Sequence, residues 1–243
     1  WLCEAAQLDQ RASALAHVLR AAGAEPGGRV AVMLPNCIEF VECLAATAKL
    51  RCASLTLNWH LRSEELSWIL HDSGAQVLVA HTDLRDVVEA AANEITVLWV
   101  GDDYEMHLDA ADAPPITYGW PTSWPVIYTS GTSGRPKGVV HGAVASPEIM
   151  TMAQDGLLAL WGYNADDIHL AAGPLYHAAP SGYTNTTLYA GGTVVIMGSW
   201  EPLEFLRLVE THRVTTTFLT PAHFIRLLEI AAIDRARFDT TSL

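Results

Sequence analysis

The sequence predicts an α/β protein with mostly parallel sheets flanked by helices. Helical and strand patterns alternate along the chain, and the strand patterns are continuous apolar runs such as residues 30–34. Such runs are typical of parallel strands buried on both faces. Three of the later helix patterns open with a polar residue followed by Pro, which is favoured at the first helical position because its missing N–H costs nothing there. This alternation favours a parallel sheet covered on both faces by helices.

The first hundred residues follow this rhythm closely. Leu8 and Leu15 belong to an amphipathic helix that stops at Gly23. Asn36 is the expected N-cap of the next helix. Ser63 begins a third helix, and two acids follow it at the positive end of the helix dipole. A fourth helix is expected at 83–92, and strands are expected at 30–34, 54–58, 76–80 and 95–100.

The second part of the chain starts with a break in the rhythm. Residues 101–123 begin acidic and become Pro-rich without either period, which predicts a surface loop. Strands are then expected at 124–129 and 139–141, on either side of a Gly-rich loop. Later strands are expected at 168–172, 193–197 and 214–219, and helices at Ser146-Pro147, Glu201-Pro202 and Thr220-Pro221.

Composition excludes several classes of protein. The 243 residues carry a net charge of −13, which argues against a nucleic-acid partner because phosphate-backbone binding needs a basic face. The 50% hydrophobic content argues against disorder. Four Cys without zinc spacing fit the reduced thiols of a cytoplasmic protein. Residues 168–200 lack charge but contain Pro174, Pro180 and a Gly pair, so they predict buried core and not a transmembrane segment.

Residues 128–138 carry the most informative motif, Tyr-Thr-Ser-Gly-Thr-Ser-Gly-Arg-Pro-Lys-Gly. Glycines let backbone N–H groups approach one anion, and hydroxyls can bind phosphate oxygens or Mg²⁺. Lys adds a point charge suited to a polyphosphate. A simple Gly/Ser surface turn is the alternative. It does not account for Lys137, one of only two lysines in the chain beside twelve arginines.

This segment is not a Walker loop, in which Lys directly follows Gly and a helix continues. Here Pro136 precedes Lys137 and Gly138 follows it, and the next residues have a strand pattern. The sequence therefore predicts a strand–loop–strand phosphate site, which argues against a P-loop kinase or GTPase.

The loop resembles the signature loop of the AMP-forming adenylating enzymes, the superfamily of acyl-CoA synthetases, luciferases and peptide-synthetase adenylation domains. Ser133 stands where that family usually has Thr, and it keeps the hydroxyl. Weaker matches follow the family order over nearly the whole chain, at residues 29–36, 58–66, 174–177, 191–195 and 216–221.

The resemblance implies a two-step reaction. A carboxylate attacks the α-phosphate of ATP to give acyl-AMP and pyrophosphate, and a thiol, usually that of coenzyme A, then displaces AMP. It implies Lys137, Thr132 and His177 as catalytic residues and Thr132 as the Mg²⁺ contact, which together stabilise developing charge. The residues implied to bind ATP are Thr129, Ser130, Gly131, Thr132, Ser133, Gly134 and Lys137.

His177 allows two interpretations. From spacing alone, a single His between a strand and a helix-like run is more often a hydrogen-bonded structural residue. The resemblance instead places it beside the reacting carboxylate, where it would position the acyl and phosphate groups, since a carboxylate needs no base at pH 7. Residues 181–188 are either one wall of the acid pocket or a site of close helix packing. Eight further histidines without mutual metal spacing are interpreted as structural or surface residues: His60, His71, His81, His107, His141, His169, His212 and His223.

The implied substrate is a hydrophobic carboxylic acid, with a fatty acid as the first choice, although the sequence does not name the acid. One alternative is adenylation for a carrier-protein thiol, and another is oxidation of the adenylate. A non-catalytic protein that binds ATP or an acyl group is the alternative from another class.

The chain starts with Trp1 and not Met, and residues 237–243 resemble the approach to the family's next strand. We therefore expect residues 1–243 to be the front part of a large N-terminal AMP-binding domain with two stacked sheets. One subdomain is expected to combine 1–52 with 163–243, and the other to hold 53–162. The chain alone should then be inactive and tend to form homo-oligomers. A cytoplasmic location is expected, either free or peripheral at a membrane.

Overall fold

The computed structural model describes residues 2–92, 94–111, 114–116, 125–129, 136–139 and 147–243. The chain forms two compact units, residues 1–150 and 151–243. Each unit contains a sheet with parallel strands and flanking helices, so the predicted α/β class is confirmed.

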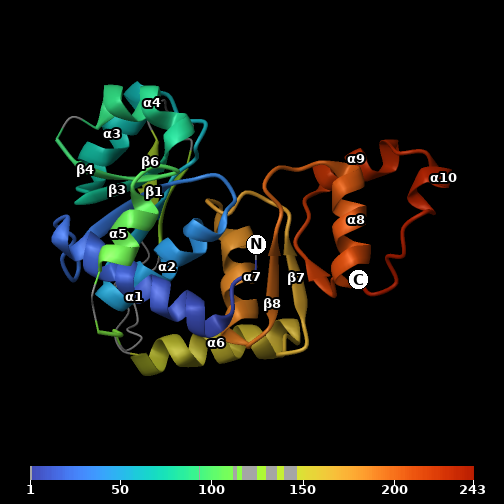
Figure 1. The fold of residues 1–243 in the computed structure, drawn as a ribbon. Helices are drawn as coiled ribbons and strands as arrows, with labels where there is room; N and C mark the ends of the chain where they lie inside the picture. The colour runs from blue at the N-terminus through green and yellow to red at the C-terminus, as the bar shows by residue number, and fades with distance from the viewer. Residues whose placement is uncertain (1, 93, 112–113, 117–124, 130–135, 140–146) are drawn as a thin grey trace. The chain divides into compact units, whose positions relative to one another are not determined.

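The first unit is built on a six-stranded sheet in the order β4-β3-β1-β2-β5-β6. Strands β1, β3, β4 and β6 are labelled in Figure 1. All neighbouring strands are parallel except β5 and β6, which are antiparallel. The strands are β1 (Arg29–Met33), β2 (Ala53–Thr56), β3 (Val77–His81), β4 (Thr96–Val100), β5 (Val126–Thr129) and β6 (Lys137–Val139).

Helices pack on this sheet through apolar side chains. One face carries buried residues such as Met33 and Leu55, which share a core cluster with Leu66 and Ile69 of α3 and Val88 of α4. Burying one such side chain stabilises the fold by about 1.5–3 kcal/mol. The helical elements are α1 (Ala5–Ala21), α2 (Ile38–Leu50), α3 (Ser63–Ser73), the 3₁₀ turn η1 (Thr82–Leu84), α4 (Arg85–Ala91) and α5 (Tyr104–Ala110).

The structure corrects two expectations in the first unit. Helix α5 lies inside the segment expected to be a surface loop, and it buries Tyr104 and Leu108. Helix α2 has Cys37 and not Asn36 at its N-cap. A seven-residue helix with two apolar contacts shows too little periodicity to be recognised from sequence.

The second unit has a three-stranded parallel sheet in the order β8-β7-β9. The first-position prolines of α8 and α9 confirm two predicted helix starts, and the Glu201 carboxylate caps α8 through the N–H groups of Leu203 and Glu204. Helix α6 (Pro147–Trp161) begins in the last residues of the first unit and continues into the second. The other elements are β7 (Ile168–Ala171), α7 (Ala178–Tyr189), β8 (Thr193–Ile196), α8 (Pro202–His212), β9 (Thr216–Thr217), α9 (Pro221–Glu229) and α10 (Ala232–Arg235).

The grouping of strands into sheets differs from the expected one. The expectation placed residues 1–52 in one sheet with 163–243, but β1 hydrogen-bonds to β2 on one side and to β3 on the other. Strand β1 is therefore an interior strand of the same sheet as the strands of residues 53–139. The expectation was wrong because an apolar run of this kind suits any central position in a sheet. How the two sheets stack stays a prediction. No helix in the described ranges has the length and apolar character needed to cross a bilayer.

Candidate functional site

The predicted phosphate loop begins and ends on the pair β5 and β6. Thr129 lies opposite Lys137 and Tyr128 opposite Gly138 in antiparallel register. The chain therefore returns as a strand, as predicted, and not as the helix of a Walker loop. The loop starts at the carboxyl end of β5, which is parallel to β2. In α/β sheets, ligands bind outside the carboxyl ends of the parallel strands.

Several predicted phosphate contacts fall outside the described residues. These are Ser130, Gly131, Thr132, Ser133 and Gly134. Of the predicted binding set, the structure describes Thr129, whose backbone ends β5, and Lys137, which begins β6. The predicted contacts of the loop residues with ATP and Mg²⁺ stay predictions.

The two lysines of the chain have different environments. The Lys49 ammonium is buried; its Nζ lies 2.6 Å from Asp9 Oδ1 and donates to the Ile116 carbonyl at 2.7 Å. Lys137 is exposed at the start of β6, and among the described residues no ion pair involves it. Lys137 is therefore available to a bound anion, whereas Lys49 is part of the fold.

Helix α3 contacts both sides of the stem of the loop. The Tyr128 hydroxyl donates to Asp72 Oδ2 at 2.5 Å, and Trp68 Nε1 donates to the Pro136 carbonyl at 3.4 Å. Burial, together with the Asp72 carboxylate, raises the pKa of Tyr128, so the hydroxyl stays a donor. Sequence analysis missed this contact, since Tyr128 and Asp72 are 56 positions apart.

Gly138 explains the close packing of this stem. A Cβ built onto Gly138 would lie 2.9 Å from Cζ of Tyr128, closer than side chains tolerate. The Tyr128 ring therefore lies against the backbone of β6, next to the Thr129–Lys137 pair.

His177 occupies the N-cap position of α7, beyond the carboxyl end of β7. Its side chain is exposed and makes no capping hydrogen bond, and its ring centroid lies 4.4 Å from that of Tyr176. The surrounding groups displace enough water to lower the pKa of the ring, which favours neutral imidazole at pH 7. His177 belongs to the second unit and Lys137 to the first, so their meeting at one site stays a prediction.

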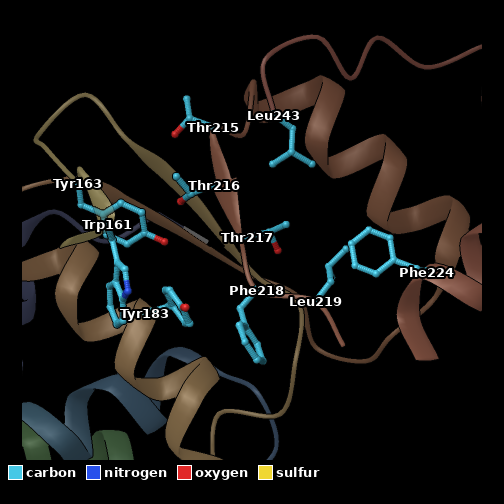
Figure 2. A pocket seen from close by; sticks show the side chains of 10 residues that line it. All are labelled: Trp161, Tyr163, Tyr183, Thr215, Thr216, Thr217, Phe218, Leu219, Phe224 and Leu243. Carbon is cyan, nitrogen blue, oxygen red and sulfur yellow. The ribbon is translucent and has the colours of Figure 1, made fainter. Parts of the chain in front are cut away.

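A pocket of about 570 Å³ lies within the second unit (Figure 2). Aromatic side chains gather on one side of it. The Tyr183 ring stacks on Trp161 with centroids 4.2 Å apart and on Phe218 with centroids 5.1 Å apart. Tyr183 is the residue of the predicted wall 181–188 that lines this pocket. The lining residues are Trp161, Tyr163, Tyr183, Thr215, Thr216, Thr217, Phe218, Leu219, Phe224 and Leu243.

His169 lies under this aromatic group and is fully buried. Its Nδ1 is 3.0 Å from the Thr216 hydroxyl, and its ring is parallel to that of Tyr183 within 14°. Burial lowers the pKa of His169 to about 4, although Asp167 opposes this shift. The neutral ring fits the structural role expected of His169 from the sequence.

Within the described ranges, no group of three or more His, Cys, Asp or Glu side chains could hold a metal ion. Mg²⁺ in nucleotide sites usually keeps several waters and is bound by substrate phosphates with only one or two protein oxygens. A single hydroxyl such as that of Thr132 is compatible with this mode of binding.

Comparisons with known proteins find similar sequences over most of the chain. Residues 5–243 match the family described as AMP-binding enzyme. The chain is 36% identical over 225 residues to a feruloyl-CoA synthase of Amycolatopsis, and the alignment covers 90% of this chain and 44% of the relative. It is 30% identical over 244 residues to a long-chain-fatty-acid–CoA ligase of Mycobacterium tuberculosis, with coverages of 96% and 48%.

A solved structure shows the same likeness. The inhibitor-bound N-terminal domain of FACL13 from Mycobacterium tuberculosis superposes with a TM-score of 0.84 at 28% identity, over 98% of this chain and 60% of that one. The chain spans somewhat less than half the length of the two curated relatives described above.

Proposed function

The chain belongs to the AMP-binding enzyme family, and from this premise we propose that it is the front part of an AMP-forming acid–thiol ligase. The observation that carries the proposal is the strand–loop–strand stem with the exposed Lys137, which forms no ion pair within the described part of the chain, beside the predicted phosphate loop. An acidic protein that binds ATP needs positive charge at the site, and this lysine supplies it.

The proposed reaction has two steps. In the first, a carboxylate oxygen attacks the α-phosphorus of ATP, the bond to the β-phosphate breaks, and pyrophosphate leaves. In the second, the sulfur of coenzyme A attacks the acyl carbon and AMP leaves. Lys137 and the loop hydroxyls would hold the β- and γ-phosphates, and Thr132 would contact the Mg²⁺ that accompanies ATP; the ion would supply stabilisation of phosphate charge. The neutral His177 positions the acyl and phosphate groups.

We further propose that the pocket in the second unit receives the acid. Its stacked rings of Trp161, Tyr183 and Phe218 offer flat apolar surface, which suits a planar aromatic acid. The feruloyl-CoA synthase relative supports this choice. A long-chain fatty acid, the first choice from sequence, is the second candidate, supported by the fatty-acid ligase relative. A carrier-protein thiol is the alternative acceptor to coenzyme A.

The test uses the full-length protein that contains these residues. It is incubated with ATP, Mg²⁺ and coenzyme A, and with ferulate, benzoate or palmitate as the acid. We expect AMP, pyrophosphate and a thioester, with the highest kcat/KM for an aromatic acid. Formation of ADP in place of AMP would contradict the reaction type. A preference for palmitate would favour the second candidate substrate.

A further inference from the structure

We infer that helix α3 is a brace for the phosphate-loop stem, and that Asp72, Trp68 and Tyr128 are positioning residues for Lys137. The role in ATP binding rests on the proposed function, whereas the brace itself rests on described contacts alone. The stem is defined here as Tyr128–Thr129 of β5 and Pro136–Gly138, of which the last two residues belong to β6.

Helix α3 contacts this short stem at two places. The Asp72 carboxylate accepts the Tyr128 hydroxyl at 2.5 Å, on the β5 side of the stem. The Trp68 indole N–H donates to the Pro136 carbonyl at 3.4 Å, on the β6 side. One helix therefore contacts the stem just before the loop starts and just after it ends.

Helix α3 is itself firmly fixed to the sheet. Leu66, Ile69 and Leu70 are buried in the core cluster of the sheet. Its N-terminus is held by one side-chain hydrogen bond, in which the Glu65 carboxylate accepts the Arg62 backbone N–H at 3.0 Å. Asp72 lies in the last turn, before the left-handed Gly74 that ends the helix. A side chain that is hydrogen-bonded to this helix is therefore held in a fixed position relative to the sheet.

The anchored Tyr128 ring determines the position of β6. Gly138 has no room for a Cβ because the Tyr128 ring lies across it. Displacing the ring would release this contact and the adjoining Thr129–Lys137 pair. Strand β6 is three residues long, is exposed, and pairs only with β5 among the described strands. Its position therefore depends on the stem contacts more than on burial.

A protease test measures the brace without any nucleotide. Endoproteinase Lys-C cleaves after Lys, and this chain has only Lys49 and Lys137. Cleavage at Lys137–Gly138 reports opening of the stem, whereas cleavage at the buried Lys49 reports global unfolding. Cleavage of a transiently opened segment follows the population of the open form.

Four variants separate the contributions. Asp72→Ala and Tyr128→Phe remove the hydrogen bond, Asp72→Asn keeps an acceptor, and Glu64→Ala removes an exposed carboxylate from the same helix. We expect Asp72→Ala and Tyr128→Phe to speed cleavage at Lys137 by about twofold to tenfold, the loss of an ordinary hydrogen bond. Asp72→Asn and Glu64→Ala should be cleaved like the wild type, and cleavage at Lys49 should not change in any variant.

The positioning role is tested by kinetics of the full-length protein. Asp72→Ala should raise the KM for ATP by about twofold to tenfold, leave the KM for the acid unchanged, and be rescued by Asp72→Asn. Loss of folded protein alone would lower the apparent kcat and not raise the KM for ATP.

Each result has a definite meaning. If Asp72→Ala and the wild type are cut at Lys137 at equal rates, the brace is wrong. If cleavage speeds up but the KM for ATP stays the same, the positioning role is wrong. A wild-type protein that does not use ATP at all would overturn the proposed function and with it the positioning role, while the protease result would still decide on the brace.

Discussion

At the scale of single residues, Lys137 carries the clearest expectation for catalysis. It is exposed on β6 and has no ion pair among the described residues, so Lys137→Ala opens no cavity and should leave the fold intact. Loss of a charge-assisted hydrogen bond to phosphate should weaken ATP use by about tenfold to a hundredfold. The measurement is the KM for ATP of the full-length protein.

The control for this change is Lys137→Arg, which keeps the positive charge and should retain more ATP affinity than the Ala variant. Circular dichroism should give identical spectra for both variants and the wild type. An Ala variant with wild-type dependence on ATP concentration would exclude a phosphate role for Lys137.

The buried His169 should make the free energy of unfolding depend on pH. Its pKa is lowered to about 4 by burial, whereas an unfolded chain titrates His near 6.5. Between these values the unfolded chain binds more protons, so the free energy of unfolding should fall as the pH drops from about 6.5 to about 4. The full loss corresponds to roughly 3 kcal/mol. Urea unfolding at several pH values measures this slope.

The matched change is His169→Gln, which can still hydrogen-bond Thr216 but does not titrate. This variant should be less stable at pH 7, with a shallower loss of stability toward pH 4. His212→Gln, at an exposed position in the same unit, should keep the wild-type slope. A His169→Gln variant with the wild-type slope would show that other groups cause the acid sensitivity.

At the scale of elements, α5 shows what the sequence could not reveal. Its only buried side chains are Tyr104 and Leu108, and the Tyr104 hydroxyl donates to Glu42 Oε2 at 2.6 Å. Glu42 is fully buried in α2 and also pairs with Arg11 of α1 at 2.6 Å. Helix α5 is therefore specified by a partner 62 positions away, and long-range pairing leaves no local periodicity to detect.

This contact gives a prediction for the stability of the first unit. Tyr104→Phe leaves the buried Glu42 carboxylate without one of its donors, which should lower the free energy of unfolding by about 1–3 kcal/mol. Met106→Ala on the same helix removes an exposed side chain and should change stability by less than about 0.5 kcal/mol. Urea unfolding compares the two. Equal stabilities would mean that the Tyr104–Glu42 contact contributes nothing.

The strands beside the predicted phosphate loop follow from local sequence, whereas the order of the strands in the sheet does not. The strand on each side of the loop follows from local residues, since Pro136 and Gly138 around Lys137 exclude a helix there. The Asp72 contact of Tyr128 and the position of β1 between β2 and β3 are choices of partner. Apolar strands are interchangeable by pattern, so their order in a sheet is fixed only by tertiary packing.

At the scale of the whole molecule, the acidic composition and the proposed ATP site are compatible because charge is used locally. The net charge is −13, yet Lys137, which has no ion pair among the described residues, stands beside the predicted phosphate loop. Of the remaining acids and arginines, several pair on the surface, as Arg207 does with Glu204 and Arg85 with Asp102. Such exposed pairs contribute little to stability, so the charge pattern bears on ligand choice more than on folding.

Exposed apolar residues in the second unit bear on whether the 243-residue chain associates in solution. Phe224, Ile225 and Leu228 of α9 are 54%, 59% and 70% exposed, and β9 pairs only with β7 among the described strands. Exposed apolar faces and open strand edges favour association, so we expect this chain to form oligomers with itself. Sedimentation velocity at several concentrations measures this. Leu228→Glu should shift the chain toward monomer with unchanged circular dichroism, whereas Leu160→Glu, at an exposed apolar position of α6, should not. A chain that stays monomeric at all concentrations would contradict the prediction, because the exposed apolar side chains of α9 would then remain in contact with water and not with a second copy of the chain.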